Sequence, residues 1–178
     1  MATSPRRRAL AGGMIALSMA AVTALGPSAS AGDAAGCSGR DLSAEVTGYS
    51  EGVSQPAAYI TVTNTSARTC VVRGYPTITS ARTKKGRQPI TVTDGAVMNA
   101  PRNQPRTIAI SPGGHAWFAV GAATAYDPPV VTFVRLRFSP NGDGTRSVRL
   151  ALQASAPTGK PFPLGVTAFA PGVGNPNQ

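Results

Sequence analysis

The sequence predicts an all-β protein built as an antiparallel β-sandwich. Short runs rich in Val, Thr, Ile, Tyr and Phe alternate with stretches of Gly, Pro, Asn and Ser, a spacing typical of sandwiches and barrels. Beyond the first 31 residues no segment has the apolar period of a helix of about ten residues or more. Only two cysteines are present, and both follow a predicted export signal.

The first 31 residues are predicted to be an export signal. Arg6-Arg7-Arg8 precedes an apolar stretch over residues 9–25, and Ala29-Ser30-Ala31 supplies a cleavage site. A retained membrane anchor is the alternative, but the apolar stretch contains glycine and falls short of the ~20 apolar residues that a span requires. The paired arginines also fit a twin-arginine signal, so the choice between this route and the general secretory route stays open. Cleavage would leave a single secreted domain of 147 residues.

Export determines the expected state of the two cysteines. Disulfides persist in oxidising compartments, so we expect Cys37 and Cys70 to be paired. In the chain-entropy model, closing a loop of this length stabilises the fold by about 3.7 kcal/mol. The segment Ala34-Ala35-Gly36-Cys37 also has the outline of a lipoprotein cleavage box, which would direct Cys37 to lipidation instead. However, the branched aliphatic residue that usually stands three positions before the cysteine is absent.

The remaining chain divides into three parts. Residues 32–36 are small or polar and are predicted to be a disordered N-terminus. Residues 37–156 are predicted to form the β-sandwich domain. Residues 157–178 are rich in Pro and Gly and are expected to add at most one edge strand, near Gly165–Phe169.

Nine strands are predicted within the sandwich, and about seven to nine strands suit an immunoglobulin-like fold. Their predicted bounds are Ala44–Tyr49, Ala57–Thr63, Thr69–Val72, Thr77–Ser80, Gln88–Thr93, Arg106–Ile110, Ala116–Ala122, Val130–Phe138 and Ser147–Leu152.

Three turns organise these strands. Tyr59–Ile78 is predicted to be a β-hairpin that turns at Asn64-Thr65-Ser66 and carries Cys70 in its return strand. Lys84-Lys85-Gly86-Arg87 is predicted to be the exposed tip of a second hairpin. The segment 139–144 contains an asparagine and two glycines, which tolerate positive φ, and therefore indicates a third hairpin loop.

The alternation of side chains indicates which faces are buried. In the strand 130–138, Leu136 and Phe138 share one face, whereas Arg135 and Arg137 share the opposite face, which ends exposed to solvent. Trp117 is expected to pack in the core. We also expect the Tyr75 ring to pack over the disulfide, with its hydroxyl group reaching a backbone group.

The charge is strongly basic. The formal net charge is +10 and falls to +7 when the signal removes Arg6, Arg7 and Arg8. Asp94 is the only acidic residue among eight cations that we take as candidate polyanion contacts. These cations are Arg68, Arg73, Arg82, Lys84, Lys85, Arg87, Arg102 and Arg106. Outside the cell the polyanions would be wall polymers or anionic lipid head groups rather than nucleic acid; the alternative is a solvated surface of one sign.

The sequence offers few groups for catalysis or metal binding. His115 is the only histidine, so any nucleophile–histidine arrangement would have to use it. With both cysteines paired, a His/Cys metal cluster lacks ligands, and Asn141-Gly142-Asp143-Gly144 lacks the remaining ligands of a calcium loop. We therefore predict no catalytic, cofactor-binding or metal residues and no enzymatic activity. Aromatic residues alternate with cations too rarely for a platform that binds single-stranded nucleic acid.

A cysteine-centred motif resembles a known family. Cys70-Val71-Val72-Arg73-Gly74-Tyr75-Pro76, the earlier Cys37, the Asn64-Thr65 turn and Pro112-Gly113 together resemble domain of unknown function 4232, found in exported proteins of high-GC Gram-positive bacteria. The resemblance covers roughly 37–152. It implies an immunoglobulin-like fold, export or surface attachment, and no assigned activity or site residues.

The predicted function is therefore that of an exported binding module. We expect a monomer that is free or held at the cell wall, has no transmembrane segment after signal cleavage, and uses a basic face for anionic envelope polymers. The alternative is an accessory or inhibitory protein that docks on a secreted enzyme or receptor through a sheet edge or a loop.

Overall fold

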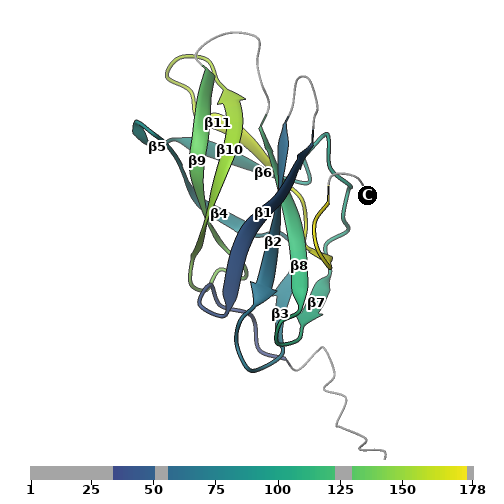
Figure 1. Ribbon diagram of the computed structural model, residues 1–178. Coiled ribbons are helices and arrows are strands. Elements are labelled where there is room, and N and C mark those ends of the chain that lie inside the picture. Colours follow the sequence, from purple (N-terminus) through teal and green to yellow (C-terminus); the bar gives the residue numbers. More distant parts are fainter. Residues whose placement is uncertain (1–33, 51–55, 123–129, 176–178) are drawn as a thin grey trace, which may run out of the picture.

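The structure, a computed structural model, describes residues 34–50, 56–122 and 130–175, which form twelve β-strands and no helix (Figure 1). The described part thus contains no helix able to cross a membrane. The predicted signal, residues 1–31, lies outside the described residues. The strands are β1 (Leu42–Ser50), β2 (Ala57–Asn64), β3 (Cys70–Arg73), β4 (Thr77–Thr83), β5 (Gly86–Gln88), β6 (Ile90–Asp94), β7 (Thr107–Ile110), β8 (His115–Ala122), β9 (Val130–Ser139), β10 (Arg146–Ser155), β11 (Phe162–Val166) and β12 (Ala170–Pro171).

Two sheets and a short ribbon make up the fold. The larger sheet has the order β1-β2-β8-β11-β6, with β12 also paired to β8, and the smaller sheet has the order β10-β9-β4-β5. Strands β3 and β7 form a separate two-stranded ribbon. The two sheets face each other (Figure 1), which confirms the predicted all-β, immunoglobulin-like sandwich.

The main core fills the space between the two sheets. Alternation along β9 and β10 directs apolar side chains inward and charged ones outward. Phe118 of β8 lies at the centre, where its ring meets Phe138 at 4.9 Å and Phe169 at 5.3 Å between centroids, both edge-on. All three rings are fully buried, and each contributes about 1.5–3 kcal/mol through removal of apolar surface from water.

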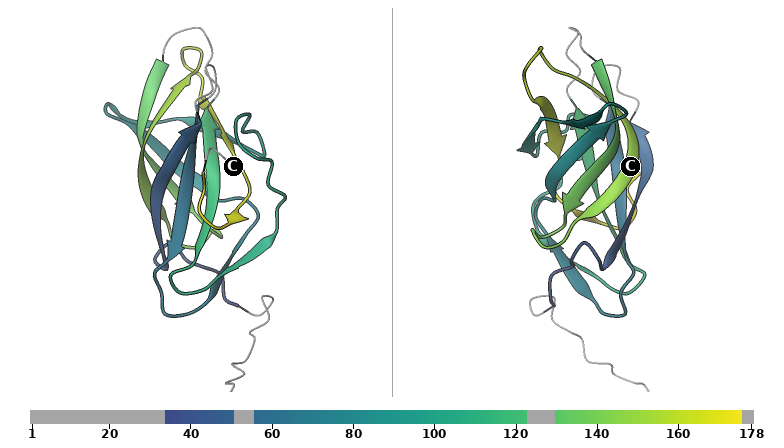
Figure 2. Two further views of the ribbon diagram at one scale, coloured as in Figure 1. Left: turned by 45° about the vertical axis from the view of Figure 1, so that its right-hand side comes forward. Right: turned by 90° about the vertical axis from the view of Figure 1, so that its left-hand side faces the viewer.

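A second apolar cluster covers the outer face of the larger sheet. Tyr59 and Trp117 lie side by side there, 5.5 Å apart, and pack with Val97 of the β6–β7 connection. This connection runs along the outside of β8 (Figure 2, left), and the carbonyl of Asn99 accepts a hydrogen bond from the Tyr59 hydroxyl at 3.0 Å. Trp117 is a packed residue, as predicted, but it belongs to this outer cluster and not to the space between the sheets.

The predicted hairpin over Tyr59–Ile78 is wrong. Strand β2 pairs with β1 and β8, whereas β3 pairs with β7 in the ribbon and not with β2. The cause lies at Asn64, whose side-chain amide donates to the carbonyls of Arg68 and Ile110 at 2.7 and 2.8 Å. These bonds join the turn to the end of β7, so the chain leaves the larger sheet instead of returning along it.

The two other predicted hairpins are present. Strands β4 and β5 pair across the tip at Lys84-Lys85, and β9 and β10 pair across the loop at 140–145. The predicted strand over Gln88–Thr93 is divided into β5 and β6, which belong to different sheets. Pro89 stands at the break, where it has no backbone N–H to contribute to a ladder.

Both ends of the domain are more ordered than the sequence suggests. The C-terminal strand β11 is not at an edge: it lies between β8 and β6. Pro163 is tolerated because the pairing with β8 starts one residue later, at Leu164. At the other end, Ala35 accepts a hydrogen bond from the Val71 amide at 3.0 Å and Gly36 bridges to Val71, so regular contacts begin before Cys37.

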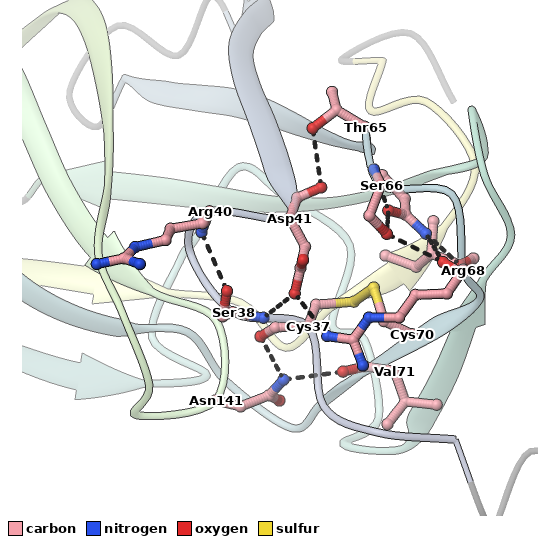
Figure 3. Close-up of a disulfide and its surroundings, with 12 residues drawn as sticks. Cys37, Ser38, Arg40, Asp41, Thr65, Ser66, Arg68, Cys70, Val71 and Asn141 are labelled. Atoms are coloured by element: carbon pink, nitrogen blue, oxygen red, sulfur yellow. Dashed lines mark hydrogen bonds and ion pairs between the residues drawn. A yellow bond between two sulfur atoms is a disulfide. The ribbon is translucent and has the colours of Figure 1, made fainter.

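The predicted disulfide between Cys37 and Cys70 is present, with an S–S distance of 2.06 Å (Figure 3). Beside it, Asn141 from the β9–β10 loop donates to the carbonyls of Cys37 at 3.0 Å and Val71 at 2.8 Å. One asparagine therefore ties this loop to the disulfide segment. The Tyr75 hydroxyl lies beside Gly95, and no hydrogen bond joins it to the described residues.

Candidate functional site

The eight cations predicted as polyanion contacts do not share one surface. Four belong to the β4–β5 hairpin: Arg82, Lys84, Lys85 and Arg87. The other four lie on the β3–β7 ribbon or on connections between strands: Arg68, Arg73, Arg102 and Arg106. The sequence cluster is therefore divided by the fold, and each part has a different environment.

Arg68 is engaged in local structure. Its guanidinium group pairs with the Asp41 carboxylate at 3.2 Å, and this carboxylate also accepts the Ser38 backbone N–H at 2.9 Å (Figure 3). The hydrogen bond from the Ser38 backbone, with further help from Arg68, lowers the pKa of Asp41 below its ordinary value despite partial burial. The pair holds the turn after β2 against the start of the domain.

Arg73 and Arg106 lie at one end of the ribbon. The Arg73 amide donates to the Asn141 side chain at 3.1 Å, and the Arg106 carbonyl accepts from the Gly74 amide at 3.2 Å. Both side chains are exposed. Their backbone groups thus bind neighbouring segments, and their side chains are left exposed to solvent.

The smaller sheet carries a charge distribution unlike the rest of the protein. Its four strands contain six arginines and no aspartate or glutamate, and two lysines form the tip of the β4–β5 hairpin. Within the described part of the chain, no ion pair involves any of these cations. The outer surface of this sheet faces the viewer in Figure 2, right.

Four of the arginines form a row across the strands. Arg149 of β10 lies opposite Arg135 of β9, Arg135 lies opposite Arg82 of β4, and Arg82 lies opposite Arg87 of β5. All four are exposed. Directly opposite residues project from the same face of a sheet with Cβ atoms about 5 Å apart, so the row places four positive charges over roughly 15 Å, the width of three strand spacings.

A shallow groove of about 450 Å³ follows part of this row. Arg82, Arg135 and Arg149 line it together with Lys84 and Val134. Arg87 does not line this groove, and its guanidinium group donates to the Thr79 carbonyl at 3.1 Å. The groove is thus lined mainly by cations from three adjacent strands.

β-Bulges set the register that creates the row. The pairing of β4 with β9 shifts between Arg82 and Thr83, so Phe133 and Leu136 are both buried although three positions separate them. Simple alternation along the strand would have placed Phe133 on the same face as Arg135. The bulge instead turns Phe133 inward against Phe162, at 5.6 Å between ring centroids, and leaves Arg135 exposed beside Arg82.

Only part of this site could be predicted from the sequence. It indicated the exposed face of Arg135 and Arg137 but did not connect them to the hairpin cations, and it missed Arg149. The alternation Val148-Arg149-Leu150 shows that Arg149 faces outward. No local pattern shows that Arg149 lies opposite Arg135, because that depends on the register of two strands.

Other features of the described residues supply little chemistry. His115 is exposed and its Nδ1 atom lies 2.9 Å from the Thr63 hydroxyl. Within the described residues no three His, Cys, Asp or Glu side chains are grouped as metal ligands would be. A cavity of about 400 Å³ beneath the β6–β7 connection is lined mainly by small and apolar residues, including Val97, Met98 and Leu164, with Arg102 as its one charged member.

Comparison with known proteins assigns a family without an activity. No curated protein and no solved structure matches the chain. A sequence profile of the family described as Domain of unknown function (DUF4232) matches residues 37–170, from the first cysteine of the disulfide to the beginning of β12. The match covers most of the chain and extends past the predicted domain end at residue 156. The chain therefore belongs to the DUF4232 family.

Proposed function

We propose that this chain is an exported, non-enzymatic β-sandwich module that binds anionic polymers of the cell envelope. The outer face of the β10-β9-β4-β5 sheet is the binding surface. The observation that carries the proposal is the row of Arg149, Arg135, Arg82 and Arg87, in which like charges stand opposite each other on four strands.

The row disfavours the folded state in the absence of a ligand. Like charges directly opposite each other on a sheet are destabilising, by an amount comparable to the ~0.2–1 kcal/mol that a favourable cross-strand pair contributes. A polyanion bound to this face would place negative groups beside the arginines, so that attraction to the ligand offsets the repulsion between the arginines. It would also release counterions, which makes binding depend strongly on salt.

Export places such a surface beside the polymers that it would bind. The signal-like N-terminus and the Cys37–Cys70 disulfide both suit an oxidising location outside the cytoplasm. Secretion into the medium and retention at the wall are both compatible with a salt-sensitive contact. A sandwich with binding groups on its sheet surface needs no moving part or catalytic group for this role.

A sedimentation experiment with isolated bacterial cell walls tests the proposal. The disulfide-bonded protein is expected to sediment with the walls at low ionic strength and to be released progressively as sodium chloride is raised. Absence of binding at low salt, or binding that salt does not weaken, would overturn the proposal. Recovery of one stoichiometric protein partner from culture medium in place of wall binding would favour the docking alternative.

Two triple variants with the same net charge locate the surface. Arg82, Arg135 and Arg149 are changed to Gln in the first, and Arg73, Arg102 and Arg106 are changed to Gln in the second. The first is expected to lose most wall binding and the second to keep most of it. Equal losses would show that net charge, and not the smaller sheet, determines binding.

A further inference from the structure

We infer that the ligand of this face is a linear polymer of phosphate groups that lies across the strands and places one group at each arginine of the row. This inference rests on the proposed function and specifies the chemistry and direction of the bound polymer. It follows from three observations on the outer face of the smaller sheet.

The first observation is the direction in which the cations align. On β10 the outward neighbours of Arg149 are Ser147 and Ala151, both neutral. On the edge strand β5, Arg87 is the only charged residue. Four positive charges therefore follow one another across the strands, whereas a polymer along the outer face of β10 would meet Arg149 alone and one along β9 would meet Arg135 and Arg137.

The second observation is the contrast with the neighbouring row. Arg137 lies two residues from Arg135 on β9, and its cross-strand partners are Ser147 and Ser80. Its guanidinium group donates to the Thr145 hydroxyl at 2.7 Å. Arg137 is thus an exposed arginine on the same strand that has no cation opposite it, and it provides an internal control for the direction of the ligand.

The third observation is that the arginines of the row are direct cross-strand neighbours. Arg135 has an arginine directly opposite on each side, and the groove brings Arg82, Arg135 and Arg149 together. Arginine donates paired hydrogen bonds to a phosphate group, and a linear phosphate polymer repeats such a group along its whole length. Arginines whose Cβ atoms lie about 5 Å apart therefore suit a polymer that presents one phosphate group to each guanidinium group.

The inference predicts a dependence on chain length and on salt. The row spans roughly 15 Å, so long-chain inorganic polyphosphate is expected to bind, whereas orthophosphate and tripolyphosphate bind much more weakly. Neutralisation of four phosphates gives a slope of about −3 in a plot of log K against log salt, by analogy with single-stranded nucleic acids. Removal of one contact should reduce that slope by about 1.

The experiment is calorimetric titration of the disulfide-bonded protein with long-chain polyphosphate at several salt concentrations. Four single variants are compared: Arg135→Gln and Arg149→Gln in the row, Arg137→Gln beside it, and Arg106→Gln remote from it. The row variants should weaken binding by about tenfold or more, and Arg106→Gln by about threefold or less. Arg137→Gln should weaken binding less than Arg149→Gln does. Cooperative thermal unfolding of each of the four variants checks that the fold is retained.

The outcomes separate this inference from the proposed function. If neither polyphosphate nor polyglutamate binds at low salt, the proposed function fails. If polyphosphate binds but Arg135→Gln and Arg106→Gln reduce its affinity equally, the row does not guide the polymer and the inference alone is overturned. The same conclusion follows if Arg137→Gln reduces the affinity as much as Arg149→Gln does. If polyglutamate or orthophosphate binds as tightly as long-chain polyphosphate, a linear phosphate polymer is not the preferred ligand. The proposed binding of polyanions would still hold in that case.

Discussion

Two asparagines hold together the end of the molecule that contains the disulfide. Asn64 is 1% exposed and bonds to the carbonyls of Arg68 and Ile110, while its own side-chain oxygen accepts from the Ser66 amide at 2.9 Å. Asn141 similarly bonds to the Cys37 and Val71 carbonyls. An amide has both donors and an acceptor, so it satisfies backbone groups of either kind in one place.

Replacement of Asn64 by Ala should therefore destabilise the fold strongly. The buried Ile110 carbonyl, the partly buried Arg68 carbonyl and the Ser66 amide would each lose a hydrogen bond, and we expect the free energy of unfolding to fall by about 2–4 kcal/mol. Urea unfolding measures the change. Thr65→Ala is the control, because it removes one exposed hydrogen bond to Asp41 and should cost less than about 1 kcal/mol; equal losses in the two variants would contradict this role for Asn64.

The lowered pKa of Asp41 gives a pH-dependent contribution to stability. The ionised carboxylate is favoured in the folded state, so its contribution is present above the unfolded pKa of about 3.9 and is lost as pH falls through the lower folded value. Asp41→Asn should reduce stability at pH 7 by less than about 1 kcal/mol because Arg68, the partner in the ion pair, is exposed to solvent. Urea midpoints of the two proteins should approach each other as pH falls through the folded pKa of Asp41; a difference that stays constant as pH is lowered would show that the charge of Asp41 has no part in it.

At the level of elements, the C-terminal strand is integral to the larger sheet. Strand β11 pairs with β8 on one side and with β6 on the other, and it brings Phe162 and Leu164 into the core. The β6–β7 connection packs over it so closely that a Cβ at Gly165 would collide with the Ala96 carbonyl. Absence of a side chain at Gly165 is therefore what lets this connection lie against the sheet.

Gly165→Ala should accordingly destabilise the protein by about 1–3 kcal/mol, since the added methyl group forces the connection away from the sheet. Thermal or urea unfolding measures the loss. The Trp117 fluorescence should change as well, because Val97 of the same connection packs in the Trp117 cluster. A variant with wild-type stability and fluorescence would mean that the connection can move freely, contrary to the packing described above.

The strands of the sandwich were predictable where local pattern decides them. Alternation in residues 134–138 and the turn at Lys84-Lys85 are properties of neighbouring residues, and the structure has both features. Strand β11 was underestimated because Pro163 and Gly165 disfavour strands in isolation, and only contacts with β8 and β6 overcome that preference. The pairing of β3 with β7 joins segments far apart in the sequence, which no hairpin signal can indicate.

The candidate site was less predictable than the fold for the same reason. Cations can be counted in the sequence, but the row of Arg149, Arg135, Arg82 and Arg87 exists only because strands β10, β9, β4 and β5 meet in one register. A shift of one residue in any strand would move its arginine to the opposite face. Conversely, Arg68 was one of the eight candidate polyanion contacts in the sequence, but in the folded protein its guanidinium group pairs with Asp41.

At the scale of the whole molecule, the charge is unevenly distributed between the two sheets. The smaller sheet carries only positive charges on its strands, whereas β1 and β6 of the larger sheet carry Glu45 and Asp94. A surface of one sign attracts polyanions over a distance and orients the molecule as it approaches them. The same surface repels itself when no ligand is bound.

This self-repulsion predicts an unusual effect of mutation on stability. Arg135→Gln should raise the free energy of unfolding by roughly 0.5 kcal/mol at low ionic strength, because it removes the charge that has an arginine on both sides. The gain should shrink as salt screens the remaining charges. Arg106→Gln, which changes the net charge equally, should show no such gain. Destabilisation by Arg135→Gln at every salt concentration would indicate instead that the Arg135 stem contributes packing.

The most direct test of the central claim is to map the polyanion contact by nuclear magnetic resonance. Long-chain polyphosphate is added to the isotopically labelled, disulfide-bonded protein at low salt, and shifts of backbone amides and arginine side chains are followed. We expect the largest chemical-shift changes to cluster at Arg82, Arg135 and Arg149, with little change on the β3–β7 ribbon. Shifts centred on Arg73 and Arg106, or spread evenly over all cations, would contradict the claim that the smaller sheet is the binding surface.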